Sequence, residues 1–416
     1  MIHTFQIQHQ IPEDSTRKML SLAREYMKLP YEKAVHQLTG RLIKDKNQQH
    51  RGTYLDDINK MIPLKEYDCA TKSVKINPAF FGLGFNGITL MRICIQKGKT
   101  KKKGIEYGAV ECQFYLKLEI NPRTLCNPLH TFTIDLYEAS TENNRRLKTM
   151  FYSIMTNTLC KYDNSMAYLC DLQSWNCNRI DYTLNMKFPT VEEKRLFWEL
   201  THKTSAYNRT QRKRMKDVKM MEQSAAEGNQ SYKTLFYDKQ DECTHTYKNI
   251  SDENLLPLLL QADNVIRMEH QVRKDGIASI KNRYHFPDRS IMHFLSEEIA
   301  SKELLNRYDK MVGTGDFYHR EEAKRIIRKK IKSEAMQERL IQLLALLAQK
   351  RHLDKAREYF TCPNHPEQQR NFPSAHGTTK TFNDRITKLR ELGINPMLIT
   401  DGCNVRFMKN PRYLLA

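Results

Sequence analysis

Six short segments in the first two thirds of the chain are strand-like, and the pattern changes to helical from about residue 290. They are residues 2–8, 87–97, 107–121, 178–187, 231–238 and 264–273, and apolar and polar residues alternate most clearly in 2–8 and 178–187. A period of two predicts β-strands with one buried face, and a Gly-bounded turn between the second and third segments indicates an antiparallel hairpin. The sequence therefore predicts an α+β fold: a mainly antiparallel sheet with flanking helices, followed by a helical C-terminal domain.

Helical patterns separate and follow these strands. Apolar residues at three- and four-residue spacing, or good start signals, predict helices at residues 16–40, 140–162, 251–261, 320–350 and 381–392. Residues 361–380 carry three prolines and one glycine and are typical of a loop. We place the main domain boundary near residue 310. This gives a region 1–310, possibly in two halves at 1–140 and 141–310, and a basic helical domain 311–416.

The charge of the chain is strongly positive. Lys and Arg number 68 and Asp and Glu 48, so the net charge is +20. Three basic runs contribute: a hairpin tip, residues 203–219 and residues 324–332. Their candidate DNA-binding residues are Lys101, Lys102, Lys103, Arg209, Arg212, Lys213, Arg214, Lys324, Arg325, Arg328, Lys329 and Lys330. One such run is usually a solvated helix face, but three runs with this net charge favour a nucleic-acid partner.

Other features exclude whole classes of protein. The chain has no long uncharged apolar window and no secretory signal or transit peptide, so we expect a cytoplasmic protein with reduced thiols and no membrane span. The basic runs lack interleaved Trp, Phe and Leu, which disfavours a membrane surface. Neither a P-loop nor a dinucleotide fingerprint is present, which disfavours an ATP-driven motor or a nicotinamide enzyme.

A zinc site has weak support. Cys362, His365 and His376, with Cys403 further on, are ligand types, but their spacing is not that of a regular zinc finger. Ordinary loop residues explain the pattern as well.

Three of the predicted strands carry residue types that could cleave a phosphodiester. Asp181 and Glu269 could hold one Mg²⁺ or Mn²⁺ ion if they share a sheet face. Tyr237 could then attack phosphorus, although a phenol with a pKa near 10 needs a cation or base beside it. Lys239 follows two residues later and would point the same way on a strand. Taken by themselves, the same residues are more simply read as a packed tyrosine and a salt-bridged sheet edge.

The order of these segments resembles that of the replication initiators of filamentous phages and related plasmids, the gene II/X proteins. The resembling patches are the opening strand at Met1-Ile2, YLKLEINP at 115–122, RID at 179–181, TLFYDKQDE at 234–242, VIRMEHQVR at 265–273 and the helix 381–392 followed by GINP at 393–396. The patches run through nearly the whole chain. The 203–219 region is more basic than the family pattern leads us to expect, which puts the mode of origin recognition in doubt.

The resemblance implies nicking of one strand at a replicon origin in the bacterial host cytoplasm. Tyr237 matches the family's nucleophile, which becomes linked to a 5′-phosphate, and the reaction requires Mg²⁺ (or Mn²⁺). Lys239 is carried over as a helper, Asp181 and Glu269 as metal-side carboxylates, and Glu119 as a weaker third. His270 is more simply read as a surface histidine than as a ligand. The implied partners are double- and single-stranded origin DNA and the host helicase and polymerase.

Two other functions remain open at this stage. A non-enzymatic origin-binding regulator of phage or plasmid replication would use the same basic surfaces without nicking. An RNA-binding protein would use the same charge but would favour exposed aromatic platforms, and no such motif is present. Tyr232 and Tyr284 are candidates for a second tyrosine that acts in termination.

Overall fold

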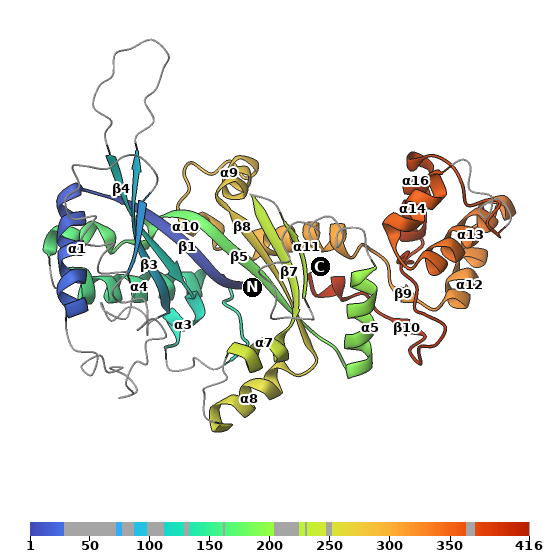
Figure 1. Ribbon diagram of the computed structural model, residues 1–416, viewed down its shortest axis with the longest axis horizontal. Helices are drawn as coiled ribbons and strands as arrows, with labels where there is room; N and C mark the ends of the chain where they lie inside the picture. The colour runs from blue at the N-terminus through green and yellow to red at the C-terminus, as the bar shows by residue number, and fades with distance from the viewer. Residues whose placement is uncertain are drawn as a thin grey trace, which may run out of the picture. The chain divides into compact units, whose positions relative to one another are not determined.

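The computed structural model describes residues 1–28, 72–76, 87–97, 112–128, 133–160, 163–203, 224–228, 231–246, 252–362 and 371–415. Its strands follow the order β2-β3-β4-β1-β5-β8-β7-β6 in one sheet, and β9 and β10 form a second, two-stranded sheet (Figure 1). The α+β class predicted from the sequence is confirmed, including the helical C-terminal region. Both central strands β5 (Asn176–Lys187) and β8 (Val265–Arg273) run through the division between two compact units.

The units are discontinuous in sequence. Unit 1 comprises Met1–Tyr182 and Gln271–Ala300, and unit 2 comprises Thr183–His270 and Ser301–Ala416. This division differs from a single boundary near residue 310, because the chain leaves unit 1 along one strand and returns to it along another.

Unit 1 contains the longer run of strands. β1 (Ile2–Ile11) pairs antiparallel with β4 (Cys112–Ile120) on one side and with β5 on the other, and β4 continues to β3 (Ile88–Lys97) and β2 (Lys72–Ile76). The β3–β4 pairing confirms the predicted hairpin, whose basic tip at 101–103 lies outside the described residues. The helices of this unit are α1 (Glu13–Lys28), α3 (Pro122–Cys126), α4 (Thr141–Met155), α9 (Lys274–Arg283) and α10 (Ile291–Phe294).

The two faces of this sheet differ in polarity because side chains alternate along each strand. Phe5, Ile7, Leu116 and Leu118 are buried on one face. The core also includes Trp175, whose ring meets Phe151 of α4 edge-on and whose indole N–H donates to the Leu169 carbonyl. Gln6, Gln8, Lys117, Glu119 and Arg179 are only partly buried. Direct cross-strand pairing of Gln6 with Glu119 and Arg179, and of Gln8 with Lys117, gathers them on the other, polar face.

A β-bulge in β5 modifies that polar face. Gln6 pairs with Arg179 and Ile7 pairs with Cys177, so Asn178 is an extra residue in β5. The burial pattern records the same interruption, because Cys177 and Ile180 are buried while both residues between them are partly exposed. A bulge re-aims a side chain in this way without breaking the strand.

Unit 2 contains the shorter strand run and most of the helices. β7 (Tyr232–Asp238) pairs antiparallel with β6 (Ser224–Gly228) and neighbours β8. α5 (Val191–His202) precedes β6 in sequence, and α7 (Lys239–Thr246) and α8 (Asp252–Ala262) lie between β7 and β8. Phe197 anchors an aromatic core, with ring contacts to Phe188, Phe236 and Phe317.

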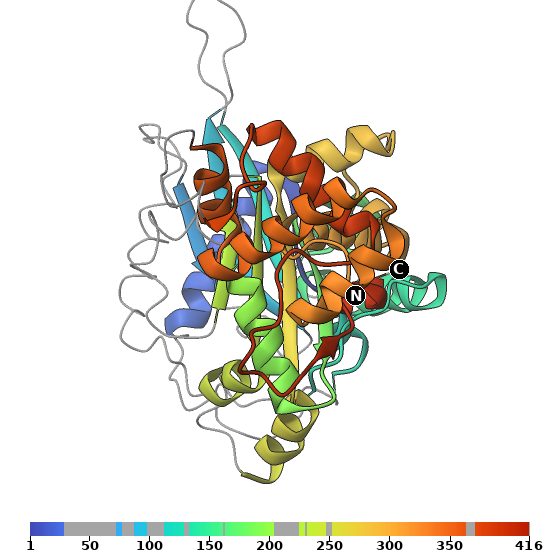
Figure 2. The same ribbon diagram turned by 90° about the vertical axis from the view of Figure 1, so that its right-hand side faces the viewer.

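The C-terminal helices gather together at the end of the chain, drawn orange to red in Figure 2. They follow α11 (Glu297–Met311) and are α12 (Arg320–Lys330), α13 (Glu334–Lys350), α14 (Leu353–Thr361) and α16 (Thr379–Glu391). The continuous helical pattern expected at 320–350 is two helices, because Ile331 adopts an extended backbone and Ser333 caps a new helix that starts at Glu334, where its hydroxyl accepts the Met336 N–H. β9 (Phe317–Tyr318), which precedes α12, pairs antiparallel with β10 (Phe407–Met408), which follows α16.

Candidate functional site

Tyr237 lies near the end of β7, buried in unit 2. Its side chain is 8% exposed, and its hydroxyl donates a hydrogen bond to Oε2 of Glu269 on β8 at 3.2 Å. Arg267 lies two residues before Glu269 on the same strand and is 1% exposed; its Nε donates to Asn185 of β5 at 2.7 Å. The structure therefore brings together two residues that the sequence singled out, Tyr237 and Glu269, and adds Arg267.

This environment holds the phenol in its protonated form. Burial raises the pKa of Tyr237 well above its usual value near 10, and the negative charge of Glu269 raises it further. The Arg267 guanidinium acts in the opposite direction but does not offset these effects. A neutral hydroxyl hydrogen-bonded to a carboxylate is the ground state of a nucleophile paired with a general base, and it is equally the resting arrangement of a satisfied core tyrosine.

Lys239 does not continue the strand as its spacing from Tyr237 suggested. Oδ1 of Asp238 accepts hydrogen bonds from the backbone N–H groups of Gln240 and Asp241, so Asp238 ends β7 and caps α7. The premise that Lys239 shares a strand face with Tyr237 is therefore wrong. The sequence signal was available, because an aspartate followed by acidic residues in the next turn is a helix start.

The Lys239 ammonium is buried and forms an ion pair with Glu242 of α7. Burial raises the pKa of Glu242, but the Lys239 charge and hydrogen bonds from Lys239 and Thr246 outweigh it, so the pKa lies below its ordinary value. Glu242 is in turn one of the charges that raise the pKa of Tyr237. Lys239 thus belongs to the surroundings of the tyrosine through Glu242.

His270 is buried, which corrects its reading as a surface histidine. Only 1% of it is exposed, and its Nδ1 lies 2.8 Å from the Thr234 hydroxyl. Burial and the nearby positive charges of Arg307 and Lys310 lower its pKa to about 3. A neutral imidazole that bonds a threonine is a structural group of the unit 2 core.

Asp181 and Glu119, the other two predicted metal-side carboxylates, lie in unit 1 and meet at Arg179. The Nη2 atom of Arg179 lies 2.9 Å from Asp181 Oδ2 and 3.3 Å from Glu119 Oε2. The Thr4 hydroxyl also donates to Asp181, and the Gln6 amide donates to Glu119 at 2.6 Å. The strand register causes this convergence, since Thr4 pairs with Asp181 and Gln6 pairs with both Glu119 and Arg179.

These donors do not fit a metal ion as they are arranged. An arginine guanidinium occupies the space between the two carboxylates and offsets part of their negative charge. Within the described ranges, no group of three or more His, Cys, Asp or Glu side chains is placed to hold a cation. The requirement for Mg²⁺ or Mn²⁺ implied by the resemblance stays a prediction, and no chemical step below is assigned to a metal.

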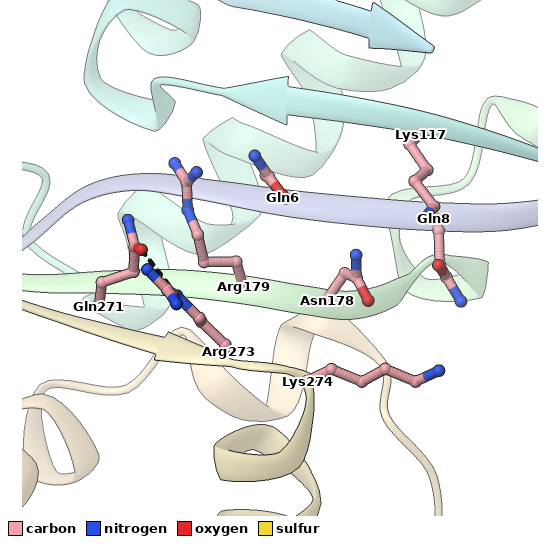
Figure 3. A pocket seen from close by; sticks show the side chains of 8 residues that line it. All are labelled: Gln6, Gln8, Lys117, Asn178, Arg179, Gln271, Arg273 and Lys274. Atoms are coloured by element: carbon pink, nitrogen blue, oxygen red, sulfur yellow. Dashed lines mark hydrogen bonds between the residues drawn. The ribbon is translucent and has the colours of Figure 1, made fainter. Parts of the chain in front are cut away.

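A polar pocket of about 530 Å³ lies within unit 1. Four of its lining side chains are cationic: Lys117, Arg179, Arg273 and Lys274. The other four are carboxamides: Gln6, Gln8, Asn178 and Gln271. Figure 3 shows seven of them on the neighbouring strands β1, β4, β5 and β8 and Lys274 at the start of α9, with Arg273 hydrogen-bonded to Gln271. Apart from Arg179, none of these residues was a sequence candidate, although the spacing of Gln6 and Gln8 within FQIQHQI was a signal for a polar strand face.

Most of the predicted DNA-binding residues cannot be placed. Lys101, Lys102, Lys103, Arg209, Arg212, Lys213 and Arg214 lie outside the described residues. The third run forms α12, where Lys324 pairs with Glu321 and Arg325 pairs with Glu322. Arg328 and Lys329 are exposed, and Lys330 donates to the Leu392 carbonyl. α12 therefore presents a cationic last turn, while its first turn is largely neutralised.

The remaining sequence candidates are dispersed. Tyr232 lies under the Arg307 guanidinium at 3.3 Å, and Tyr284 stacks on Phe286. Cys362 is exposed and Cys403 partly buried; both are free thiols, and His365 lies outside the described residues, so the zinc hypothesis is not tested. Among the helices of the described chain, none is both long and apolar enough to cross a membrane.

Comparisons with family models, with curated protein sequences and with solved structures found no match to this chain.

Proposed function

We propose that this protein is a replication initiator that nicks one strand of its replicon origin by tyrosine transesterification and rejoins it after rolling-circle replication. The observation that carries the proposal is the hydrogen bond from Tyr237 to Glu269, with Arg267 beside the phenol. A nucleophile within reach of a carboxylate base, next to a cation, is the minimum set for phosphoryl transfer to a side chain. The net charge of +20 supports a nucleic-acid substrate.

The chemistry follows from the protonation state. Because Tyr237 is held neutral, it attacks as its proton passes to Glu269, and Arg267 stabilises the negative charge that develops on the phenolic oxygen. A new bond forms between that oxygen and phosphorus while the bond from phosphorus to the 3′-oxygen breaks. The 3′-oxygen takes up a proton, which leaves a 5′-phosphotyrosine and a free 3′-hydroxyl.

That 3′-hydroxyl would prime a host polymerase, with a host helicase opening the duplex. The phosphodiester energy is kept in the phosphotyrosine, so the reverse transesterification rejoins the strand without ATP. This agrees with a sequence that lacks a P-loop.

The burial of Tyr237 favours a second candidate. A phenol that is 8% exposed, with its pKa raised, is also what a core tyrosine looks like in a protein that binds the origin without cutting it. Such a regulator of phage or plasmid replication would bind through the same positive charge and show no nicking.

A nicking assay separates the two candidates. Purified protein is mixed with supercoiled DNA that carries the region around its own gene, with Mg²⁺, with Mn²⁺ or with EDTA. The initiator gives open circles and a protein–DNA adduct that survives denaturant and is lost in Tyr237→Phe. Tyr318→Phe is the matched control, because it removes one hydroxyl from a half-buried tyrosine of β9 in the same unit and outside the site. An adduct that persists in Tyr237→Phe would mean that another residue is the nucleophile. Binding without any nick would favour the regulator.

A further inference from the structure

We propose that the polar pocket of unit 1 binds a short segment of single-stranded nucleic acid, with its phosphates on the cations and a base edge on the carboxamides. All eight lining residues belong to unit 1. The proposal uses neither Tyr237 nor Glu269, and it holds whether or not the protein nicks DNA.

The charges around the pocket favour an anion. Lys117, Arg273 and Lys274 line it together with Arg179, and no carboxylate is among the lining side chains that the structure describes. Glu119 and Asp181 compensate Arg179 from outside the lining, which leaves more positive than negative charge at the pocket. The Arg179 Nε is buried and has no acceptor among the described residues, as expected beside a site that receives an oxygen ligand.

The carboxamides favour a ligand with both donors and acceptors. Gln6, Gln8, Asn178 and Gln271 each offer an N–H₂ donor and an oxygen acceptor. The β5 bulge is the reason that Asn178 takes part, since it inserts that residue beside Arg179. Base edges match such groups, and in an unpaired strand their Watson–Crick edges are free to bond with a protein.

The size and lining of the pocket limit the ligand. A volume of about 530 Å³ falls within the range of roughly 300–1,000 Å³ typical of small-ligand sites. No aromatic side chain is among the eight described residues that line it, so these residues offer a base no stacking partner. Binding should therefore depend on phosphate contacts and weaken steeply with salt.

Other basic regions could also bind nucleic acid, so the test must measure a change at the lysines that line the pocket. The full chain is briefly treated with an amine-acylating reagent, and modification of each lysine is measured by mass spectrometry. The probe is a deoxythymidine trinucleotide without terminal phosphates, compared with the same trinucleotide carrying neutral methylphosphonate linkages and with free thymidine monophosphate. Lys148 of α4 is the internal control, since it is partly buried like Lys117, lies in the same unit and does not line the pocket.

We expect the charged trinucleotide to protect Lys117 and Lys274 but not Lys148, and the neutral one to protect neither. Equal protection by the free monophosphate would mean that the pocket binds a free nucleotide, and it would overturn the proposal that its ligand is a segment of single-stranded nucleic acid. Unchanged modification of Lys117 and Lys274 with the charged trinucleotide at millimolar concentration would overturn the site itself.

Two variants complete the test. Lys117→Gln combined with Arg273→Gln should weaken trinucleotide binding by more than tenfold, because each removes a charged hydrogen-bond donor. Lys274→Gln changes an exposed side chain and should leave the fold intact. It should therefore weaken binding of the trinucleotide without lowering the stability of the protein. Lys148→Gln should bind as the unchanged protein does. If the pocket variants bind the trinucleotide normally, the proposal is wrong. Nicking activity, measured on the same variants, tests the proposed role of Tyr237 separately.

Discussion

The two candidate sites in this protein treat charge in opposite ways. In unit 2, Tyr237 and Arg267 are buried, and the phenol donates a hydrogen bond to the partly exposed Glu269, so the charges act on a phenol that is held neutral. In unit 1, the cations and carboxamides line an open pocket with no nucleophile among them. Burial strengthens electrostatic effects on a reacting group, whereas exposure lets charged groups meet a polyanion. We infer that unit 2 is suited to chemistry and unit 1 to binding.

The most severe test of this comparison removes the nucleophile. Tyr237→Phe should reduce nicking by at least about a thousandfold, because no other group of the unit 2 site can form the covalent bond. Protection of Lys117 by the trinucleotide should be unchanged. The two readouts are adduct formation in denaturing gels and lysine acylation. A variant that also loses protection would mean that the sites are not independent.

Replacing the base should have the next largest effect. Glu269→Gln should lower the nicking rate by roughly 10²–10⁴-fold, the usual contribution of a general base. It also removes a charge that raises the pKa of Tyr237, so the pKa should fall towards its ordinary value. The residual rate should therefore increase with pH as phenolate forms. A pH–rate profile measured by single-turnover nicking checks this, and a flat alkaline limb contradicts it.

The binding side of the comparison should respond to salt. Lys117→Gln should weaken single-strand binding by about tenfold at low salt and reduce the dependence of log affinity on log salt by roughly 0.7, the value for one phosphate contact. Fluorescence anisotropy at several salt concentrations measures both. Lys148→Gln is the control, and equal salt dependence in the two variants would remove Lys117 from the interface.

The smallest expected effect concerns the stability of unit 2. The buried Nδ1 of His352 accepts the N–H of Asp354 and caps α14, and burial lowers the pKa of His352. In the unfolded chain His352 takes up a proton at about pH 6.5, whereas in the folded protein it does so only at lower pH. The cap therefore stabilises the folded state fully above about pH 6.5, and this stabilisation is lost as the pH falls through the lowered pKa of the folded protein.

His352→Asn keeps a cap acceptor and does not titrate. It should therefore reduce the loss of stability in mild acid by about 1 kcal/mol or less. Urea unfolding at about pH 7.5 and about pH 5 measures the difference. Equal losses in the variant and the unchanged protein would show that the cap does not contribute.

Much of the fold could be predicted from local pattern. β1, β3, β5, β7 and β8 lie where the alternation placed strands, since period two with one apolar face leaves few other structures. β6 (SAAEG) and β2 (KSVKI) were not predicted, because five residues without a clear apolar face look like loop until neighbouring strands pair with them. The division of units through β5 and β8 could not be read from sequence either, because it depends on contacts between distant segments.

The candidate sites divide along the same line. The sequence by itself determined a basic α+β chain and identified Tyr237, Glu269, Asp181 and Glu119 as residues of interest, because residue type and strand period are local properties. Only the tertiary structure decided their partners. Cross-strand register placed Arg179 between Asp181 and Glu119, and the pairing of Tyr237 with Glu269 joined residues 32 positions apart. Register and burial are set by packing across the whole sheet, and they determine whether a carboxylate binds a cation, an arginine or a phenol.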